Sequence, residues 1–215
     1  PEAASTGEMI SDLLVSFGWR LSTPAAEAIM TSILGDTQGL SNELTTAHTY
    51  RVMADLTELG ADRSALEEAR REYGKMVPKI YDYKAKLIQD TKFTEDNEVA
   101  YVVINQKELN EFSPLYNPVP LIQPDMLQVK GVAVSIVFKV YDSGKITGAI
   151  RTNNAYPIAA KLAESLGGGG HPHASGFKIE DGRSFEDIRD ECLRKALELS
   201  ATYKGNDDET IQYTF

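Results

Sequence analysis

The chain has 215 residues, of which 42% are hydrophobic and 25% are charged, and its formal net charge is −10. This composition is typical of a globular protein with room for one large domain or two small ones, and no apolar run approaches the roughly 18 residues of a membrane span. The acidic charge excludes broad, non-specific binding to nucleic acid, because that requires a surface that displaces counterions from phosphates. The single cysteine, Cys192, has no partner for a disulfide, so we expect a reducing, cytoplasmic location.

The first third of the chain predicts helices, because capping residues precede apolar residues at helical spacing. Ser5 to Glu8 has the spacing of a capping box, and Pro24 can open a second helix. Thr45 or Thr46 can cap a third helix, and Asp62 can cap a fourth, charged on its outer face. The expected helices cover about 6–18, 24–35, 46–59 and 62–89.

After Asp96 the sequence becomes rich in β-branched residues, which predicts a sheet. The turn Asp142-Ser143-Gly144 should join two strands, and a proline-containing segment before them should form loop and short helices. We also expect helices at 156–166 and 184–203, followed by a frayed tail at 205–215. The expected strands cover 99–104, 132–140, 145–151 and 174–179.

Four glycines, Gly167 to Gly170, join the expected helix at 156–166 to the strand at 174–179. Gly167 can end the helix in the left-handed conformation, and the following glycines can aim N–H groups at an anion with no Cβ in the way. The alternative is a loop without a ligand. The acidic bias also relaxes between Arg151 and Lys178, so we expect an anionic ligand to bind here.

Residues Gly167 to Phe177, GGGGHPHASGF, resemble the signature of the DHHA1 domain, a module that accompanies DHH-family phosphoesterases. In that family a strand ending in Ser-x-Arg-Ser comes before the glycines. Here it reads Ala149-Ile150-Arg151-Thr152, which keeps the arginine and one hydroxyl but replaces the first serine. The resemblance implies that the substrate is bound by Arg151, Thr152, Gly168, Gly169, Gly170 and His171. His173, at a variable position, is expected to be structural or solvated.

Two earlier stretches, Pro1 to Glu8 and Thr31 to Leu40, resemble the end of a DHH catalytic domain, including its fourth motif. The nearest class is the NrnA-like one, which comprises exonucleases for short oligonucleotides and phosphoadenosine-phosphate phosphatases. The resemblance implies an α/β protein in three parts. These are a helical remnant of a parallel-sheet DHH domain at 1–62, a linker helix at 63–92, and a smaller α/β DHHA1 domain with a mixed sheet at 93–215.

The family's catalytic centre holds two manganese ions with aspartates and histidines from four motifs, and of these ligands the chain has only Asp36. One carboxylate cannot hold a two-metal site, which needs several donors around the pair. His48 falls at a helix start, where a solvent-facing or capping role is expected. Judged from local sequence alone, Asp36 is a cap or turn residue, and Arg151 is either a phosphate ligand or a surface arginine.

The resemblance thus implies that the parent protein is a manganese-dependent phosphodiesterase or exonuclease. We expect this chain, as its C-terminal part, to be inactive and not to bind Mn²⁺ tightly. The alternative is a non-catalytic nucleotide- or RNA-binding module. The expected partner is a short oligonucleotide or a nucleotide phosphate. We expect no membrane partner, and a homodimer is compatible with the sequence.

Aromatic side chains can stack on nucleotide bases. For Tyr101, Phe138 and Phe177 we expect core packing instead, because they lie in expected strands. Packing is also expected for Trp19. Cys192, on the last helix, should be an inert thiol.

Overall fold

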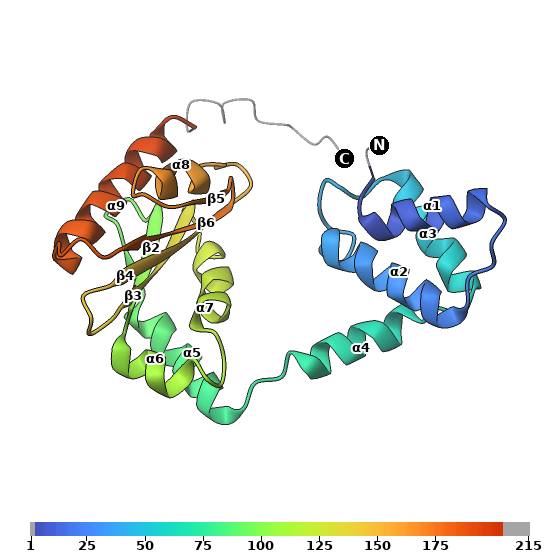
Figure 1. Ribbon diagram of the computed structural model, residues 1–215, viewed down its shortest axis with the longest axis horizontal. Coiled ribbons are helices and arrows are strands. Elements are labelled where there is room, and N and C mark those ends of the chain that lie inside the picture. The colour runs from blue at the N-terminus through green and yellow to red at the C-terminus, as the bar shows by residue number, and fades with distance from the viewer. Residues whose placement is uncertain (1–2, 204–215) are drawn as a thin grey trace. The chain divides into compact units, whose positions relative to one another are not determined.

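The computed structural model describes residues 3–203, so Pro1, Glu2 and the expected tail at 205–215 lie outside the described residues (Figure 1). The chain divides into two compact units, the first ending at Lys75 and the second beginning at Met76. None of the helices within residues 3–203 is long and apolar enough to cross a membrane.

The first unit is helical, and its helices begin at the capping residues that the sequence indicates. The Ser5 hydroxyl accepts the Glu8 N–H, Thr46 forms a capping box with Thr49, and the Asp62 carboxylate caps the fourth helix. The four helices are α1 (Thr6–Ser16), α2 (Thr23–Asp36), α3 (Ala47–Glu58) and α4 (Arg63–Tyr73).

The first helix, α1, buries its polar side. Its buried residues are Gly7, Glu8 and Ser11, and the Glu8 carboxylate accepts hydrogen bonds from the Ala4 N–H at 2.5 Å and the Thr49 hydroxyl at 3.1 Å. A Cβ on Gly7 would lie 2.9 Å from the Ser32 Cβ, so glycine permits the close approach of α1 to α2. Leu14 packs against the core of this unit, but the other large apolar side chains of α1 are exposed, namely Met9, Ile10, Leu13 and Val15.

The expectation that Trp19 packs in a core is wrong, because its side chain is 67% exposed. Trp19 follows Gly18, which has a positive φ of 66° and turns the chain after α1. The indole lies 5.8 Å from the ring of Phe17, which is itself exposed. The tryptophan therefore extends the exposed apolar side of α1.

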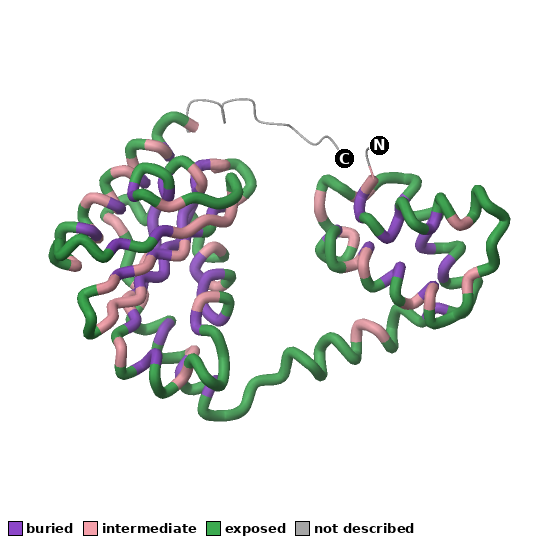
Figure 2. The backbone as a smooth tube through the Cα atoms, in the orientation of Figure 1, coloured by how far each residue is buried: buried purple, intermediate pink, exposed green. Residues whose placement is uncertain are grey.

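The single helix expected at 62–89 is also wrong, because the structure has two helices, α4 and α5 (Pro78–Asp90). Gly74 caps the end of α4, and Val77 is extended with ψ of 150°. The physical reason is Pro78, which disfavours the helical conformation for the residue before it. No residue of α4 is buried (Figure 2), whereas α5 packs into the second unit.

The second unit is built on a six-stranded mixed sheet with strand order β1-β2-β3-β4-β6-β5. Strands β2 and β3 are parallel and the other neighbouring pairs are antiparallel, which confirms the expected mixed sheet. The strands are β1 (Lys92–Phe93), β2 (Val99–Asn105), β3 (Val134–Val140), β4 (Ile146–Thr152), β5 (Gly169–His171) and β6 (Ala174–Ile179).

Helices cover both faces of this sheet (Figure 1). One face packs against α5, α6 (Gln106–Phe112) and α7 (Pro118–Leu127). The other packs against α8 (Ala159–Glu164) and α9 (Phe185–Ala201). The sheet is therefore the middle layer of three.

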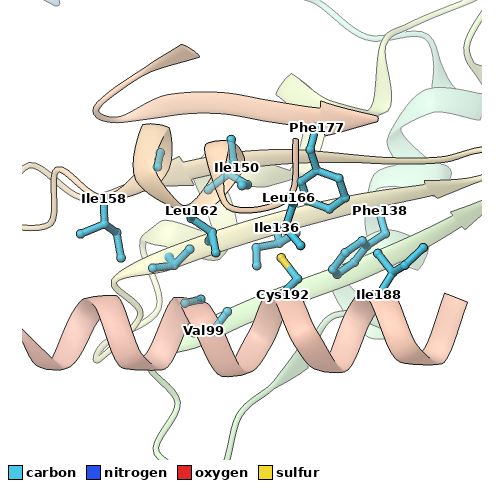
Figure 3. Packing of buried hydrophobic residues seen from close by; sticks show 14 of the residues in the cluster. Val99, Ile136, Phe138, Ile150, Ile158, Leu162, Leu166, Phe177, Ile188 and Cys192 are labelled. Atoms are coloured by element: carbon cyan, nitrogen blue, oxygen red, sulfur yellow. The ribbon is translucent and has the colours of Figure 1, made fainter. Parts of the chain in front are cut away.

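The core under α8 and α9 contains the aromatic residues that were expected to pack there (Figure 3). Phe138 and Phe177 are buried, and Tyr101 packs against them from a partly buried position. Cys192 lies in the same core, where burial raises the pKa of its thiol to about 12. These placements confirm packing for the three aromatic residues and an inert thiol for Cys192.

Candidate ligand-binding site

The strand register brings Arg151 and His171 into one row across the sheet. Arg151 on β4 lies opposite Ala174 on β6, and Ala174 lies opposite His171 on β5. Directly paired residues share a face, and neighbouring strands are about 4.8 Å apart, so the two backbones are roughly 10 Å apart in this row. The strand register thus places an arginine and a histidine on either side of a small alanine.

The adjoining row on the same face consists of small residues. Ala149 on β4 lies opposite Gly176 on β6, which lies opposite Gly169 on β5. These residues form the floor of a hollow of about 330 Å³, which we call the β4–β5 hollow. Val119 and Gln123 of α7 also line it, as does Arg151. Small floor residues leave the main chain open to a ligand.

The four glycines have different structural roles, and part of the expected loop is strand β5. Gly167 has φ of 77° and follows α8, as expected for a left-handed end to a helix. The N–H of Gly168 donates to the Ala163 carbonyl at 2.8 Å, so it is not free to meet an anion, contrary to the expectation from sequence. A Cβ on Gly168 would lie 2.2 Å from the Gly176 carbonyl oxygen, which makes glycine necessary there.

Gly170 is also required by the strand pairing, since it has φ of 146° and a Cβ there would lie 2.7 Å from the Ser175 Cα. Gly169 differs from both neighbours, because nothing lies within 4 Å of the position that its Cβ would take. It lines the β4–β5 hollow. A side chain at Gly169 would therefore enter the hollow without meeting the rest of the fold.

The side chains of Arg151 and His171 have no partner among the described residues. Arg151 is exposed, and its guanidinium makes no hydrogen bond or ion pair with residues 3–203. The imidazole of His171 is likewise unbonded there, while the His171 carbonyl accepts the Ser175 hydroxyl at 2.7 Å and fixes the turn between β5 and β6. The donors of both side chains are available to a ligand.

Thr152, expected to bind substrate, lies on the other face of β4 from Arg151. It is buried, and its Oγ1 lies 3.2 Å from Nδ1 of His173. The Thr152 N–H donates to the His173 carbonyl at 3.2 Å. Successive strand residues point to opposite faces, so the structure does not bring the Thr152 hydroxyl to the hollow. His173 has the structural contact that was expected of it.

The expected metal ligand Asp36 is the last residue of α2 and is exposed. Its main-chain carbonyl accepts the Asn42 side-chain amide at 2.9 Å. His48 lies in the first turn of α3, and its Nε2 lies 2.9 Å from a carboxylate oxygen of Asp12. Across residues 3–203 no group of three or more His, Cys, Asp or Glu side chains is arranged to hold a metal ion. The described residues therefore do not fit a two-manganese site.

Sequence reasoning missed Gln123. It lies on α7 in a run of apolar residues and is 2% exposed. Its Nε2 donates to the main-chain carbonyls of Ala149 at 2.9 Å and Ser135 at 3.3 Å. A glutamine among buried apolar neighbours was the available signal, because a buried amide must find hydrogen-bond partners.

Comparison with known proteins agrees with this architecture: residues 121–198 match the DHHA1 domain family. This part of the chain is therefore a DHHA1 domain. The resemblance carried by GGGGHPHASGF is thus confirmed, and the β4–β5 hollow lies largely within the DHHA1 domain.

Two curated relatives match most of the chain. An uncharacterised protein of Mycoplasma pneumoniae is 29% identical over 205 residues, covering 94% of this chain and 61% of that protein. The bifunctional oligoribonuclease and PAP phosphatase NrnA of Bacillus subtilis is 29% identical over 180 residues, covering 82% of this chain and 55% of NrnA. The chain thus spans 55–61% of the length of these relatives.

The fold is also found among solved structures. An exopolyphosphatase-related protein from Bacteroides fragilis superposes with a TM-score of 0.76 at 22% sequence identity, covering 93% of this chain and 59% of that one. This likeness confirms the α/β fold class that the sequence predicts.

Proposed function

We propose that the DHHA1 domain binds the phosphorylated end of a nucleotide or short oligonucleotide in the β4–β5 hollow. The observation that carries the proposal is the unpartnered guanidinium of Arg151 beside a floor of Ala149, Gly176 and Gly169. A guanidinium offers a planar fork of donors that matches phosphate oxygens. The oligoribonuclease and PAP phosphatase named among the relatives supports this choice of ligand.

The charge of the chain supports a local rather than a broad site. With a net charge of −10, the protein repels a polyanion in general, so a phosphate needs specific donors. Arg151 supplies a permanent charge, and His171, in the same row, supplies a donor even when neutral. Gly169 allows the phosphate to approach the main chain.

We further propose that a longer protein containing this chain hydrolyses phosphoesters with two Mn²⁺ ions, one of which Asp36 would help to hold. By itself, the chain described here is proposed to bind the substrate without turning it over. A non-catalytic nucleotide-binding module is the second candidate, and it is favoured by the lack of a metal-ligand cluster within residues 3–203.

Calorimetric titration with a 5′-phosphorylated diribonucleotide tests the binding site. We expect Arg151→Ala to weaken binding by about 1.5–3 kcal/mol, the cost of a lost hydrogen bond to a charged group. Arg194→Ala is the matched control, because Arg194 is an exposed arginine of α9 paired with Glu198. Equal affinities for the wild type and Arg151→Ala would contradict the proposal.

A further inference from the structure

The side-chain amide of Gln123 is held in one orientation. Both main-chain carbonyls that it contacts, those of Ser135 and Ala149, can only accept hydrogen bonds. A flipped amide would place the Oε1 of Gln123 against these two oxygens. The Nε2 therefore uses its two N–H groups on the sheet, and Oε1 is the polar atom that remains.

Oε1 of Gln123 has no hydrogen-bond partner among the described residues. It is nevertheless not among the fully enclosed, unsatisfied polar atoms of that part of the chain. The side chain is otherwise buried, and it lines the β4–β5 hollow. An acceptor without a partner therefore belongs to a buried residue that lines the hollow.

We propose that Gln123 determines specificity in the β4–β5 hollow by accepting a hydrogen bond from the nucleoside part of the ligand. This inference rests on the proposed function. The donor would be an exocyclic amino group of the base or a ribose hydroxyl. Both are neutral donors from which a carbonyl oxygen can accept a hydrogen bond. A ligand lacking that donor leaves a buried acceptor unsatisfied and is rejected.

The surroundings of Gln123 suit a nucleoside. Ala149, Gly176 and Gly169 give a floor without long side chains, on which a planar base can lie, and Val119 adds an apolar wall. Gln123 is bonded to the carbonyl of Ala149, and Arg151 is two residues further along the same strand face. A nucleotide whose phosphate is bound by Arg151 can therefore place its sugar or base beside Gln123.

The test compares nucleotides that differ by one donor, using the whole chain and calorimetry. The ligands are AMP, purine ribonucleoside 5′-monophosphate, which lacks the 6-amino group, and the 2′-deoxy and 3′-deoxy forms of AMP. We expect the wild type to bind the analogue that lacks the donor to Gln123 about 5- to 50-fold more weakly than AMP. The identity of the weakened ligand shows whether that donor is the amino group or a hydroxyl.

Gln123→Leu should abolish this discrimination, so that AMP and the weakened analogue bind equally. Gln128→Leu, the same change at the exposed residue that caps the end of α7, should preserve it. The ratio of two affinities does not depend on the folded fraction, so a loss of stability in Gln123→Leu does not obscure the result.

Two failures are distinguishable. If AMP binds in an Arg151-dependent manner but all analogues bind the wild type equally, or if Gln123→Leu keeps the discrimination, the role of Gln123 is wrong and the proposed function stands. If no nucleotide binds the wild type, the proposed function itself is wrong.

Discussion

The two units differ in where their amphipathic helices place their apolar side chains. In the second unit, helices on both faces of the sheet bury their apolar residues in two cores, one of which includes Ile158, Leu162 and Ile188. In the first unit, α2 and α3 also bury apolar residues, such as Ile33 and Leu56, but α1 buries Glu8 and exposes Leu13. Helical periodicity therefore shows that a helix has an apolar side, but only the neighbouring elements decide whether that side is covered.

The largest contrast should come from matched leucine truncations. Leu162 of α8 is fully buried, whereas Leu13 of α1 is 52% exposed. We expect Leu162→Ala to lower the free energy of unfolding of the second unit by about 2–5 kcal/mol, because it leaves a cavity. Leu13→Ala should change stability by less than about 0.5 kcal/mol. Urea titrations followed by circular dichroism measure both, and similar costs would remove the distinction between the units.

A smaller effect is expected for two adjacent glycines of the second unit. Gly168→Ala should lower the free energy of unfolding by about 1–3 kcal/mol, since its Cβ meets the Gly176 carbonyl. Gly169→Ala should leave stability unchanged. Gly169→Val should keep the fold but prevent nucleotide binding, because its side chain enters the β4–β5 hollow. Thermal melts and calorimetric titration of the three variants test this, and a destabilised Gly169→Ala would contradict the assignment.

Hydrogen exchange compares the units directly. Amides of α1, α2 and α3 should be protected about tenfold less than those of β2, β3 and β4, a difference of about 1.4 kcal/mol in opening free energy. The reason is that the first unit lacks cover for the apolar side of α1. Uniformly slow exchange in both units would refute this prediction.

The last prediction concerns catalysis, for which we expect no measurable activity. Incubated with Mn²⁺ and a short oligoribonucleotide, this chain should not hydrolyse the substrate, because Asp36 is the one expected metal ligand that it carries. Turnover of about 1 per second or faster, abolished by a chelator, would contradict this. An Asp36→Asn variant would then show whether the first unit is responsible.

Local patterns in the sequence were sufficient for much of the fold. The strand expected at 174–179 is β6 (Ala174–Ile179), and Ser5 and Asp62 cap helices as their side-chain chemistry predicts. By contrast, β5 has no β-branched residue among Gly169–His171, so its pairing with β6 could not be read from propensity.

The candidate site was only partly predictable for a related reason. Arg151 and Gly169 line the hollow, but alternation along β4 turns Thr152 to the opposite face, and Gln123 comes from a distant helix. The motif identifies residues by their order in the chain. Which of them meet is decided by strand register and helix packing, and these depend on tertiary contacts.

Strand β5 has one further consequence. It is the outermost strand of its sheet, it is only three residues long, and its residues are all exposed. Edge segments with few buried contacts separate from a domain at far lower free energy than its central strands do. We therefore expect this rim of the hollow to open while the layered core stays intact, and a nucleotide bound there as proposed would hold it closed.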